Sequence, residues 1–227
     1  MAILATGCQS EARDLLAKAG LATGPQAWRA QVEIAASKAV RGAPRSGDEM
    51  FVLLGPEHHG FGAWWRRGQK MAVSVGVQGG AGHALGALIQ LAGELIAVGW
   101  APPQLAEAAK KAHAAASPAG EALDAHSHVL KRTLVIGEAG GFVAASSHEG
   151  VYPAMWSAKL AAEVILEALD SSESQDRLSE FENLWRMSIA GHLQPLESDV
   201  RFLHPLVFTN RRIAARMALS IFTGRRA

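Results

Sequence analysis

The stretch Thr133-Leu-Val-Ile-Gly-Glu-Ala-Gly-Gly-Phe-Val143, followed closely by His148-Glu-Gly-Val-Tyr-Pro-Ala-Met155, decides how this chain folds. Its first four residues form a run typical of a buried strand in a parallel sheet, and the glycines after them predict a tight turn. Helical spacing of apolar residues then predicts a helix over 151–169. This order of strand, glycine turn and helix N-terminus places backbone amides beside an anionic ligand.

The composition limits the class of protein. With 227 residues, 49% of them hydrophobic, the chain is long enough for one large domain or two small ones with a buried core. A net charge of +1 gives no field that attracts nucleic acid, so we expect no nucleic-acid partner. The single cysteine, Cys8, excludes an internal disulfide framework and fits a reducing, cytoplasmic location.

No targeting or membrane-spanning segment is predicted. The apolar start of the chain has no basic leader, and the run breaks at Thr6-Gly7. Segment 84–100 is apolar, but Gln90 and Glu94 interrupt it, so we expect a buried helix there rather than a membrane span.

The N-terminal residues predict a second strand of the core type. Ala2-Ile-Leu-Ala5 is apolar, and Thr6-Gly7 turns the chain after it. A helix over residues 10–20 is expected next, with Ser10 as its N-cap and Gly20 as the glycine that ends it.

The section from residue 26 to residue 116 has a different period. Apolar and polar residues alternate over short runs, which predicts the half-buried strands of an antiparallel sheet. Two helices are expected after the sheet, over 85–99 and 104–115. The strands are expected at 28–34, 50–54, 62–65 and 70–77, with a turn at 66–68.

The C-terminal part is predicted to be helical. A polar linker at 171–174 precedes a helix over 178–193, whose apolar residues recur at helical spacing, and a last helix is expected over 196–222. The fold class is therefore α/β, with an α+β middle section. The expected domains are 1–25 with 117–170, then 26–116, then 171–227.

The glycine-rich segment Gly79-Gly-Ala-Gly82-His-Ala-Leu-Gly86 is similar to a dinucleotide-binding fingerprint, because it follows a strand and precedes a helix. We interpret it as a connection between sheet and helix. The strand before it belongs to the antiparallel set, and no strand ending in an acidic residue follows at the required distance. Glu94 and Glu107 both lie on predicted helices.

Histidine and cysteine could also carry chemistry. The histidines have no spacing to a cysteine or carboxylate that would hold a metal, so we predict exposed loop histidines and no metal site. Cys8 stands between a strand and a helix, where a thiolate is stabilised, but no base can be named for it and we interpret it as a small turn residue. The histidines considered are His58, His59, His83, His126, His128 and His148.

From Gly137 to Met155 the sequence resembles the C-terminal flavin motif of the geranylgeranyl reductase-like FAD-dependent oxidoreductases, whose wider group includes flavoprotein monooxygenases. The family motif reads Gly-Asp-Ala-Ala-Gly-Phe-Val, then Gly-Glu-Gly-Ile and a Tyr-x-Ala-Met helix start. Looser similarities cover Ala5-Thr6-Gly7, the sheet from Phe51 to Val77, and Leu178 to Arg186. The matching motif residues are Gly137, Ala139, Gly141, Phe142, Val143, Glu149, Gly150, Tyr152, Ala154 and Met155.

The resemblance implies a partial FAD-binding Rossmann-like domain, an antiparallel substrate-domain sheet and C-terminal helices. By position, Glu138 holds the ribityl chain, the small residues 139–141 let the backbone approach the pyrophosphate, and Gly150-Val151 meets the isoalloxazine ring. The substrate is expected near Trp64 and Trp65, of which at most one lines a given pocket because neighbours on a strand face opposite sides. The implied cofactor-binding residues are Thr6, Gly7, Gly137, Glu138, Ala139, Gly140, Gly141, Phe142, Gly150 and Val151.

The chain also departs from the family pattern. Glu138 stands where Asp is usual, His148 replaces a glycine, and Ala144-Ala145 replaces Asn-Pro. No Gly-x-Gly-x-x-Gly unit of ~30 residues precedes Ala2, although in the family that unit holds the ADP moiety. We therefore expect a truncated or split flavoenzyme that binds FAD weakly or not at all by itself, with a partner chain supplying the unit or with homo-oligomers.

Two functions remain open. One is an FAD-dependent reductase or monooxygenase of an apolar, prenyl-type substrate, with NAD(P)H as reductant. The other is a non-catalytic binding module or partner subunit that keeps the fold without FAD. The basic residues Arg211, Arg212 and Arg216 beside Ile213 and Met217 fit either a peripheral membrane contact or a solvated basic face over an apolar core, and we favour the solvated face.

Overall fold

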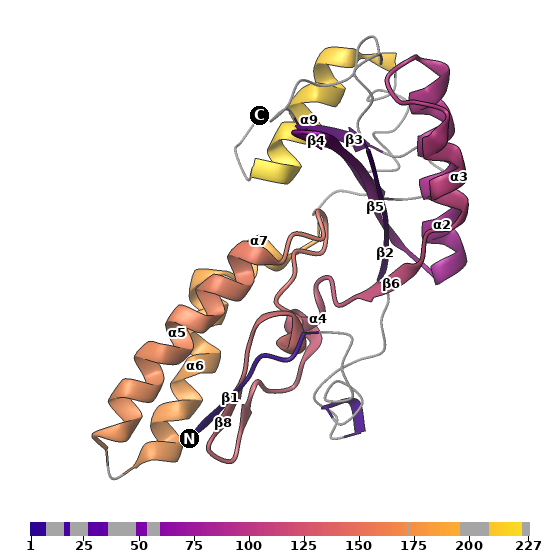
Figure 1. Cartoon of the computed structure of the whole chain (residues 1–227). Coiled ribbons are helices and arrows are strands. Elements are labelled where there is room, and N and C mark those ends of the chain that lie inside the picture. The colour runs from indigo at the N-terminus through magenta and orange to yellow at the C-terminus, as the bar shows by residue number, and fades with distance from the viewer. Residues whose placement is uncertain are drawn as a thin grey trace. The chain divides into compact units, whose positions relative to one another are not determined.

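The chain folds into two compact units (Figure 1). The first unit comprises Met1–Pro25 and Ser117–Glu197, and the second comprises Gln26–Ala116 and Ser198–Ala227. The computed structural model describes residues 1–7, 16–18, 27–35, 49–53, 60–171, 173–195 and 209–223, without the side chains of 49–53 and 218–223.

The first unit contains a three-stranded sheet in the order β1-β8-β7. β1 (Ala2–Leu4) runs parallel to β8 (Thr133–Val135), with Ala2 opposite Thr133 and Leu4 opposite Val135. β7 (Val129–Leu130) runs antiparallel to β8. The two strands predicted to be of the parallel core type therefore pair with each other.

Two long helices, α5 (Val151–Leu169) and α6 (Ser174–Ser188), lie side by side in the first unit (Figure 1). α5 has the predicted bounds. Between the sheet and these helices lies an apolar core, because both helices direct one apolar face inward. The largest members of this core are Leu134, Ile136, Phe142, Leu160, Leu178, Phe181, Trp185, Ile189 and Leu193.

Shorter elements complete the first unit. α4 (Glu121–Asp124) precedes the small sheet, and the 3-10 helix η1 (Gly137–Gly140) follows β8. The predicted helix over 178–193 is interrupted, because Ile189 leaves helical geometry between α6 and α7 (Ala190–Leu193). The side chain of Ile189 is buried at this break.

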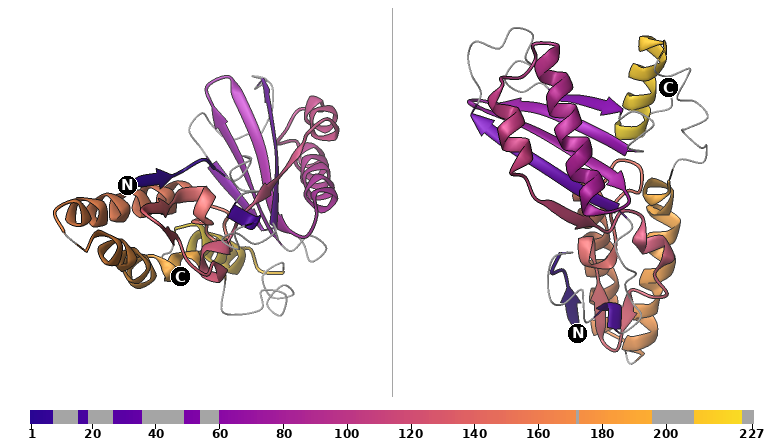
Figure 2. Two further views of the ribbon diagram at one scale, coloured as in Figure 1. Left: turned by 90° about the horizontal axis from the view of Figure 1, so that it is seen from below. Right: turned by 90° about the vertical axis from the view of Figure 1, so that its right-hand side faces the viewer.

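The second unit is a five-stranded sheet in the order β3-β4-β5-β2-β6, and α2 (Ala81–Ala97) and α3 (Gln104–Lys110) cover one of its faces (Figure 2). The pairings β3–β4, β4–β5 and β5–β2 are all antiparallel, which confirms the predicted sheet type. The strands are β2 (Ala27–Ala35), β3 (Glu49–Leu53), β4 (Gly60–Arg67), β5 (Lys70–Gln78) and β6 (Ala114–Ser117).

Strand alternation sets the core of the second unit. Val32, Val73 and Trp64 lie opposite one another in register on three adjacent strands, and all three are buried. They belong to one apolar cluster with Leu88 and Leu95 of α2. Every second residue of the central strands therefore faces the helices, as the period of two requires.

In the glycine-rich segment 79–86, Gly79 and Gly80 connect β5 to α2, as interpreted from the sequence, and the residues from Ala81 onward form the first turns of α2. β5 is antiparallel to both of its neighbours, so this connection is not part of a parallel strand–helix–strand unit.

The predicted helix over 104–115 is wrong in its second half. α3 ends at Lys110, and β6 begins at Ala114. Alanine has a strong helix propensity, but β6 adds to the sheet beside β2, whose hydrogen bonds outweigh a local preference of a few tenths of a kcal/mol per residue.

The C-terminal helix α9 (Arg211–Thr223) lies beside β3 (Figure 1). Of the helix predicted over 196–222, residues 196–208 lie outside the described residues, as do Cys8 and Ser10. In the part of the chain that the structure describes, no helix combines the length and the apolar character needed to cross a membrane.

Gly141, at the end of η1, supplies a test of the fold. It has φ +75°, and a Cβ atom there would lie 2.5 Å from the backbone nitrogen of Ala122. Gly141→Ala should lower the free energy of unfolding of the first unit by about 2–4 kcal/mol, because it adds strain and forces backbone apart. Urea unfolding followed by circular dichroism measures this change.

Gly191→Ala in α7 is the matched control, because a Cβ atom there meets nothing within 4 Å. We expect its effect to stay within about 1 kcal/mol of zero. Equal effects of the two substitutions would contradict the described packing of η1 on α4.

Candidate functional site

The turn after β1 and the turn after β8 lie side by side. The backbone N–H of Ile136 donates to the carbonyl of Leu4 at 3.0 Å, so the parallel pairing continues to the ends of both strands. Gly7 has φ +75°, and a Cβ atom built on it would lie 3.8 Å from Oε2 of Glu138. Both turns stand at the carboxyl ends of parallel strands, where open α/β sheets bind ligands.

The start of α5 joins the same region. The backbone N–H of Gly137 donates to Oγ of Ser157 at 3.1 Å, and a Cβ atom on Gly137 would lie 3.5 Å from Cβ of Ala154. These contacts attach η1 to the first turns of α5, whose N-cap is Gly150. Three segments distant in sequence thus meet in the first unit.

The ten residues predicted to bind the cofactor fall into two groups. Thr6, Gly7, Glu138, Gly150 and Val151 are exposed or half-buried, so a ligand can reach them. The other five are buried, and they are Gly137, Ala139, Gly140, Gly141 and Phe142.

The five buried residues pack within the turn that follows β8. A Cβ atom on Gly140 would lie 2.9 Å from the ring of Phe142, and the Phe142 side chain is fully buried. The backbone N–H of Gly141 donates to the carbonyl of Glu138 at 3.2 Å, and that of Phe142 donates to the carbonyl of Gly137 at 3.0 Å. These two amides are therefore satisfied within the turn.

A carboxylate also serves the start of α5. Oε1 of Glu149 accepts a hydrogen bond from the backbone N–H of Tyr152 at 2.8 Å, and Oε2 lies 3.4 Å from Nε2 of His192. The side chain thereby satisfies one of the backbone amides that the first turn of a helix leaves without an intrahelical partner.

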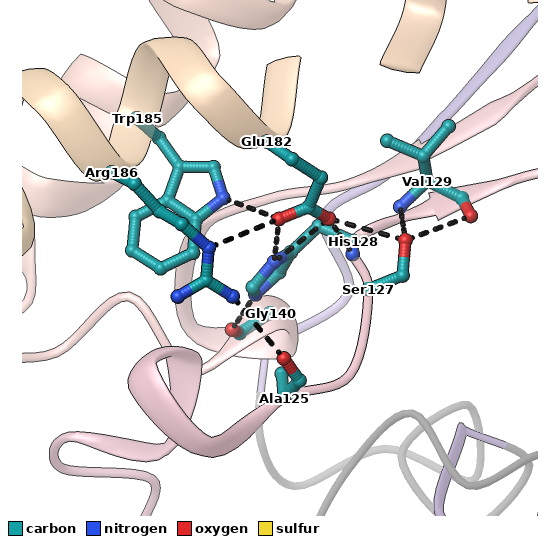
Figure 3. Close-up of polar contacts among 8 residues, drawn as sticks. All are labelled: Ala125, Ser127, His128, Val129, Gly140, Glu182, Trp185 and Arg186. Atoms are coloured by element: carbon teal, nitrogen blue, oxygen red, sulfur yellow. Dashed lines mark hydrogen bonds and ion pairs between the residues drawn. The ribbon is translucent and has the colours of Figure 1, made fainter. Parts of the chain in front are cut away.

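The sequence did not indicate the structural role of His128. The prediction of exposed loop histidines is wrong for this residue, because its side chain is only 1% exposed. Nε2 lies 2.8 Å from the carbonyl oxygen of Gly140, and Nδ1 lies 3.4 Å from Oε2 of Glu182 (Figure 3). The backbone N–H of His128 also donates to Glu182. The His128 ring therefore connects Glu182 of α6 with Gly140 in the turn that follows β8.

Glu182 is held by several donors from both sides. Trp185 Nε1 donates to Oε2 at 2.9 Å, Ser127 Oγ donates to Oε1 at 3.2 Å, and Nε of Arg186 lies 3.9 Å from Oε2 (Figure 3). Burial acts to raise the pKa of Glu182, but the hydrogen bonds from His128 and Trp185 and the attraction of His128 outweigh it. They lower the pKa from its ordinary 4.5 to about 2.

His148 is a second buried histidine. It is 8% exposed, its φ is +56°, and its Nδ1 lies 3.1 Å from Oγ of Ser117. Glycine adopts this left-handed backbone without strain, and the similar family motif has glycine at this position. The departure from the motif could have indicated this special backbone position.

No group of three or more metal-ligating side chains occurs among the residues that the structure describes. His58 and His59 lie outside them.

The structure separates the two tryptophans predicted to lie near a substrate. Trp64 is 2% exposed, lies in the core beneath the helices, and stacks on Trp100 with ring centroids 5.8 Å apart. Trp65 is half-buried on the other face of the sheet, where Cζ of Arg67 lies 5.2 Å from the centre of its ring. Only Trp65 is therefore open to a ligand on that face.

Comparison with known proteins shows the fold. No protein-family model matches the chain, and neither does any curated protein. A geranylgeranyl bacteriochlorophyll reductase-like protein from Thermoplasma acidophilum has a TM-score of 0.59 at 16% identity, over 82% of this chain and 46% of that one. The flavin-dependent halogenase CmlS has a TM-score of 0.53 at 16% identity, over 99% of this chain and 45% of that one.

The myxobacterial chondrochloren halogenase CndH, of the FAD-dependent halogenases, has a TM-score of 0.51 at 17% identity, over 98% of this chain and 54% of that one. The expected α/β fold and the resemblance to FAD-dependent oxidoreductases are thus confirmed as a likeness of fold. The chain spans about half the length of these solved structures.

The pair of Glu182 and His128 should contribute to the stability of the first unit. Glu182→Gln should lower the free energy of unfolding by about 2–3 kcal/mol, because it removes a half-buried carboxylate that accepts hydrogen bonds from His128, Trp185 and Ser127. Glu180→Gln on the same helix is the control. Glu180 and its partner Arg177 are both exposed, so we expect less than about 1 kcal/mol. Urea unfolding that ranks the two variants equally would contradict the contact.

The lowered pKa of Glu182 predicts a pH dependence of stability. A carboxyl whose folded-state pKa is depressed stabilises the fold above its unfolded-state pKa and loses that effect as the pH falls to the folded-state value. The stability difference between the wild type and Glu182→Gln should therefore shrink as the pH falls from about 4.5 toward 2. Urea unfolding at several pH values in this range measures the change, and a difference that grows between pH 4.5 and 2 would contradict it.

Proposed function

We propose that this chain is the part of an FAD-dependent oxidoreductase that holds the ribityl chain and one edge of the flavin ring. The observation that carries the proposal is the closeness of Gly7 to Glu138 at the carboxyl ends of β1 and β8, beside Gly137, which contacts Ala154 and Ser157 in the first two turns of α5. The fold is shared with flavin-dependent proteins, which supports the same assignment.

The accessible residues fit such a cofactor. The carboxylate of Glu138 is an acceptor for a ribityl hydroxyl, and the missing side chain of Gly7 leaves the backbone beside it open. The N-terminus of α5 at Gly150-Val151 favours negative charge on a neighbouring ring. FAD, when bound, supplies hydride or oxygen chemistry, and these residues bind and orient it.

The substrate class is proposed from the second unit. Trp65 and the neighbouring Phe61 and Ala63 are partly accessible on β4. An aromatic and small-residue surface of this kind suits an apolar substrate, such as a prenyl chain, and NAD(P)H is the proposed reductant.

The complete cofactor site is proposed to need more protein than this chain contains. The solved structures that it matches are about twice as long as the part it covers. We expect the adenosine half of FAD to be held by a partner chain or a further segment, so that this chain alone binds FAD weakly. A peripheral membrane contact through the basic residues of α9 is a subsidiary proposal.

One observation favours a second function, that of a non-catalytic module or partner subunit. Phe142 and Ala122 occupy the space beside Gly140 and Gly141. The turn therefore needs glycine at these positions whether or not a pyrophosphate binds.

Titration with FAD separates the two functions. We expect the chain to purify colourless and then to bind FAD saturably, measured by flavin fluorescence. Glu138→Ala should weaken binding by about tenfold or more, because it removes a charged hydrogen-bond acceptor. Glu163→Ala on the exposed side of α5 is the matched control and should leave the affinity unchanged.

Each other outcome overturns part of the proposal. Failure to bind FAD at millimolar concentration would favour the non-catalytic module. A stoichiometric yellow flavin in the purified chain would contradict the need for additional protein. Equal affinity of Glu138→Ala and the wild type would remove Glu138 from the site.

A further inference from the structure

Both ring nitrogens of His128 face hydrogen-bond acceptors. Nε2 lies 2.8 Å from the carbonyl oxygen of Gly140, and Nδ1 lies 3.4 Å from Oε2 of Glu182. A carbonyl and a carboxylate only accept hydrogen bonds, so each ring nitrogen must carry a hydrogen to make its contact. A neutral imidazole has one N–H, and its second nitrogen would turn a lone pair toward an acceptor. The geometry therefore fits an imidazolium.

In its buried surroundings, a positive charge on the His128 ring depends on the carboxylate of Glu182. The ring is 1% exposed, and its neighbours include Phe142, at 4.7 Å between ring centroids, and Trp185, at 5.1 Å. A buried cation persists only with a counter-charge. Glu182 supplies it from α6, and Glu182 is itself held by donors from Trp185 and Ser127 (Figure 3).

The other end of the contact lies in the turn that follows β8. Gly140 stands between Glu138 and Gly141, and its carbonyl belongs to the peptide bond that leads into Gly141, the residue with φ +75°. Holding this oxygen fixes the orientation of that peptide plane. The amides of Gly141 and Phe142 close the same turn through hydrogen bonds to Glu138 and Gly137.

We propose that His128 is a positioning residue: as an imidazolium paired with Glu182, it fixes the Gly140 peptide and so holds the turn that presents Glu138. The role assigned to Glu138 rests on the proposed function, whereas the hydrogen-bond clamp itself does not. Through His128, helix α6 sets the geometry of a turn whose own sequence is dominated by small residues.

The first test is the protonation of the ring. Nitrogen-15 NMR of the histidine side chains at neutral pH should show hydrogens on both nitrogens of His128. In Glu182→Gln the ring should become neutral and keep its hydrogen on Nε2, because the carbonyl of Gly140 remains. A neutral ring in the wild-type protein would overturn the proposal.

The second test is amide hydrogen exchange in the turn. His128→Phe removes both donors and should speed exchange at Gly141 and Phe142 by about tenfold, the equivalent of one hydrogen bond to a charged group. His128→Gln keeps an N–H donor toward Gly140 and should stay within about threefold of the wild type. His126→Gln, at an exposed histidine two residues away, is the matched control.

The outcomes separate this proposal from the proposed function. If His128→Phe fails to fold, His128→Gln and Glu182→Gln still decide it. Failure of the wild type to bind FAD would remove the cofactor and leave the exchange result valid. Unchanged exchange at Gly141 and Phe142 in His128→Phe, or equal acceleration in His128→Gln and His128→Phe, would overturn the clamp.

Discussion

The parallel pairing of β1 with β8 is the contact on which the candidate site depends. It places Ala2 opposite Thr133 and Leu4 opposite Val135, so the chain must close a long loop before the two strands meet. Each strand has three residues, too few to be stable as an isolated pair. The stability comes from burial of Leu134 and Ile136 against α5 and α6. Once the register is set, Gly7 and Glu138 necessarily become neighbours.

The glycine-rich motif carries two kinds of information. Gly140, Gly141 and Phe142 are required by the turn itself, because protein atoms fill the space that a larger residue would need. Glu138 and Gly7 are half-buried, so a ligand can reach them. The proposal of a cofactor therefore rests on these two residues and the start of α5, more than on the buried glycines.

Several parts of the fold could be predicted from local sequence. α5 follows from strong helical periodicity over 151–169, and β2, β4 and β5 follow from alternation, since one face of their sheet is buried. The end of α3 could not be predicted, because alanines near residue 114 suit a helix and the sheet edge decides otherwise. The hydrogen-bond partners of His128 also could not be predicted from the sequence. Glu182 is 54 residues away, and one sequence offers no sign that the two meet. His148 gave a weak indication of its left-handed backbone, because it replaces a glycine of the motif.

The proposed flavin site is tested most directly by a two-dimensional nitrogen-15 amide spectrum of the chain, recorded during addition of FAD. A site at the ends of β1 and β8 should give progressive shifts at Gly7, Glu138, Gly150 and Val151, with smaller changes at the buried glycines of the turn. Shifts confined to the strands around Trp65, or none at saturating FAD, would contradict a flavin site at the ends of β1 and β8.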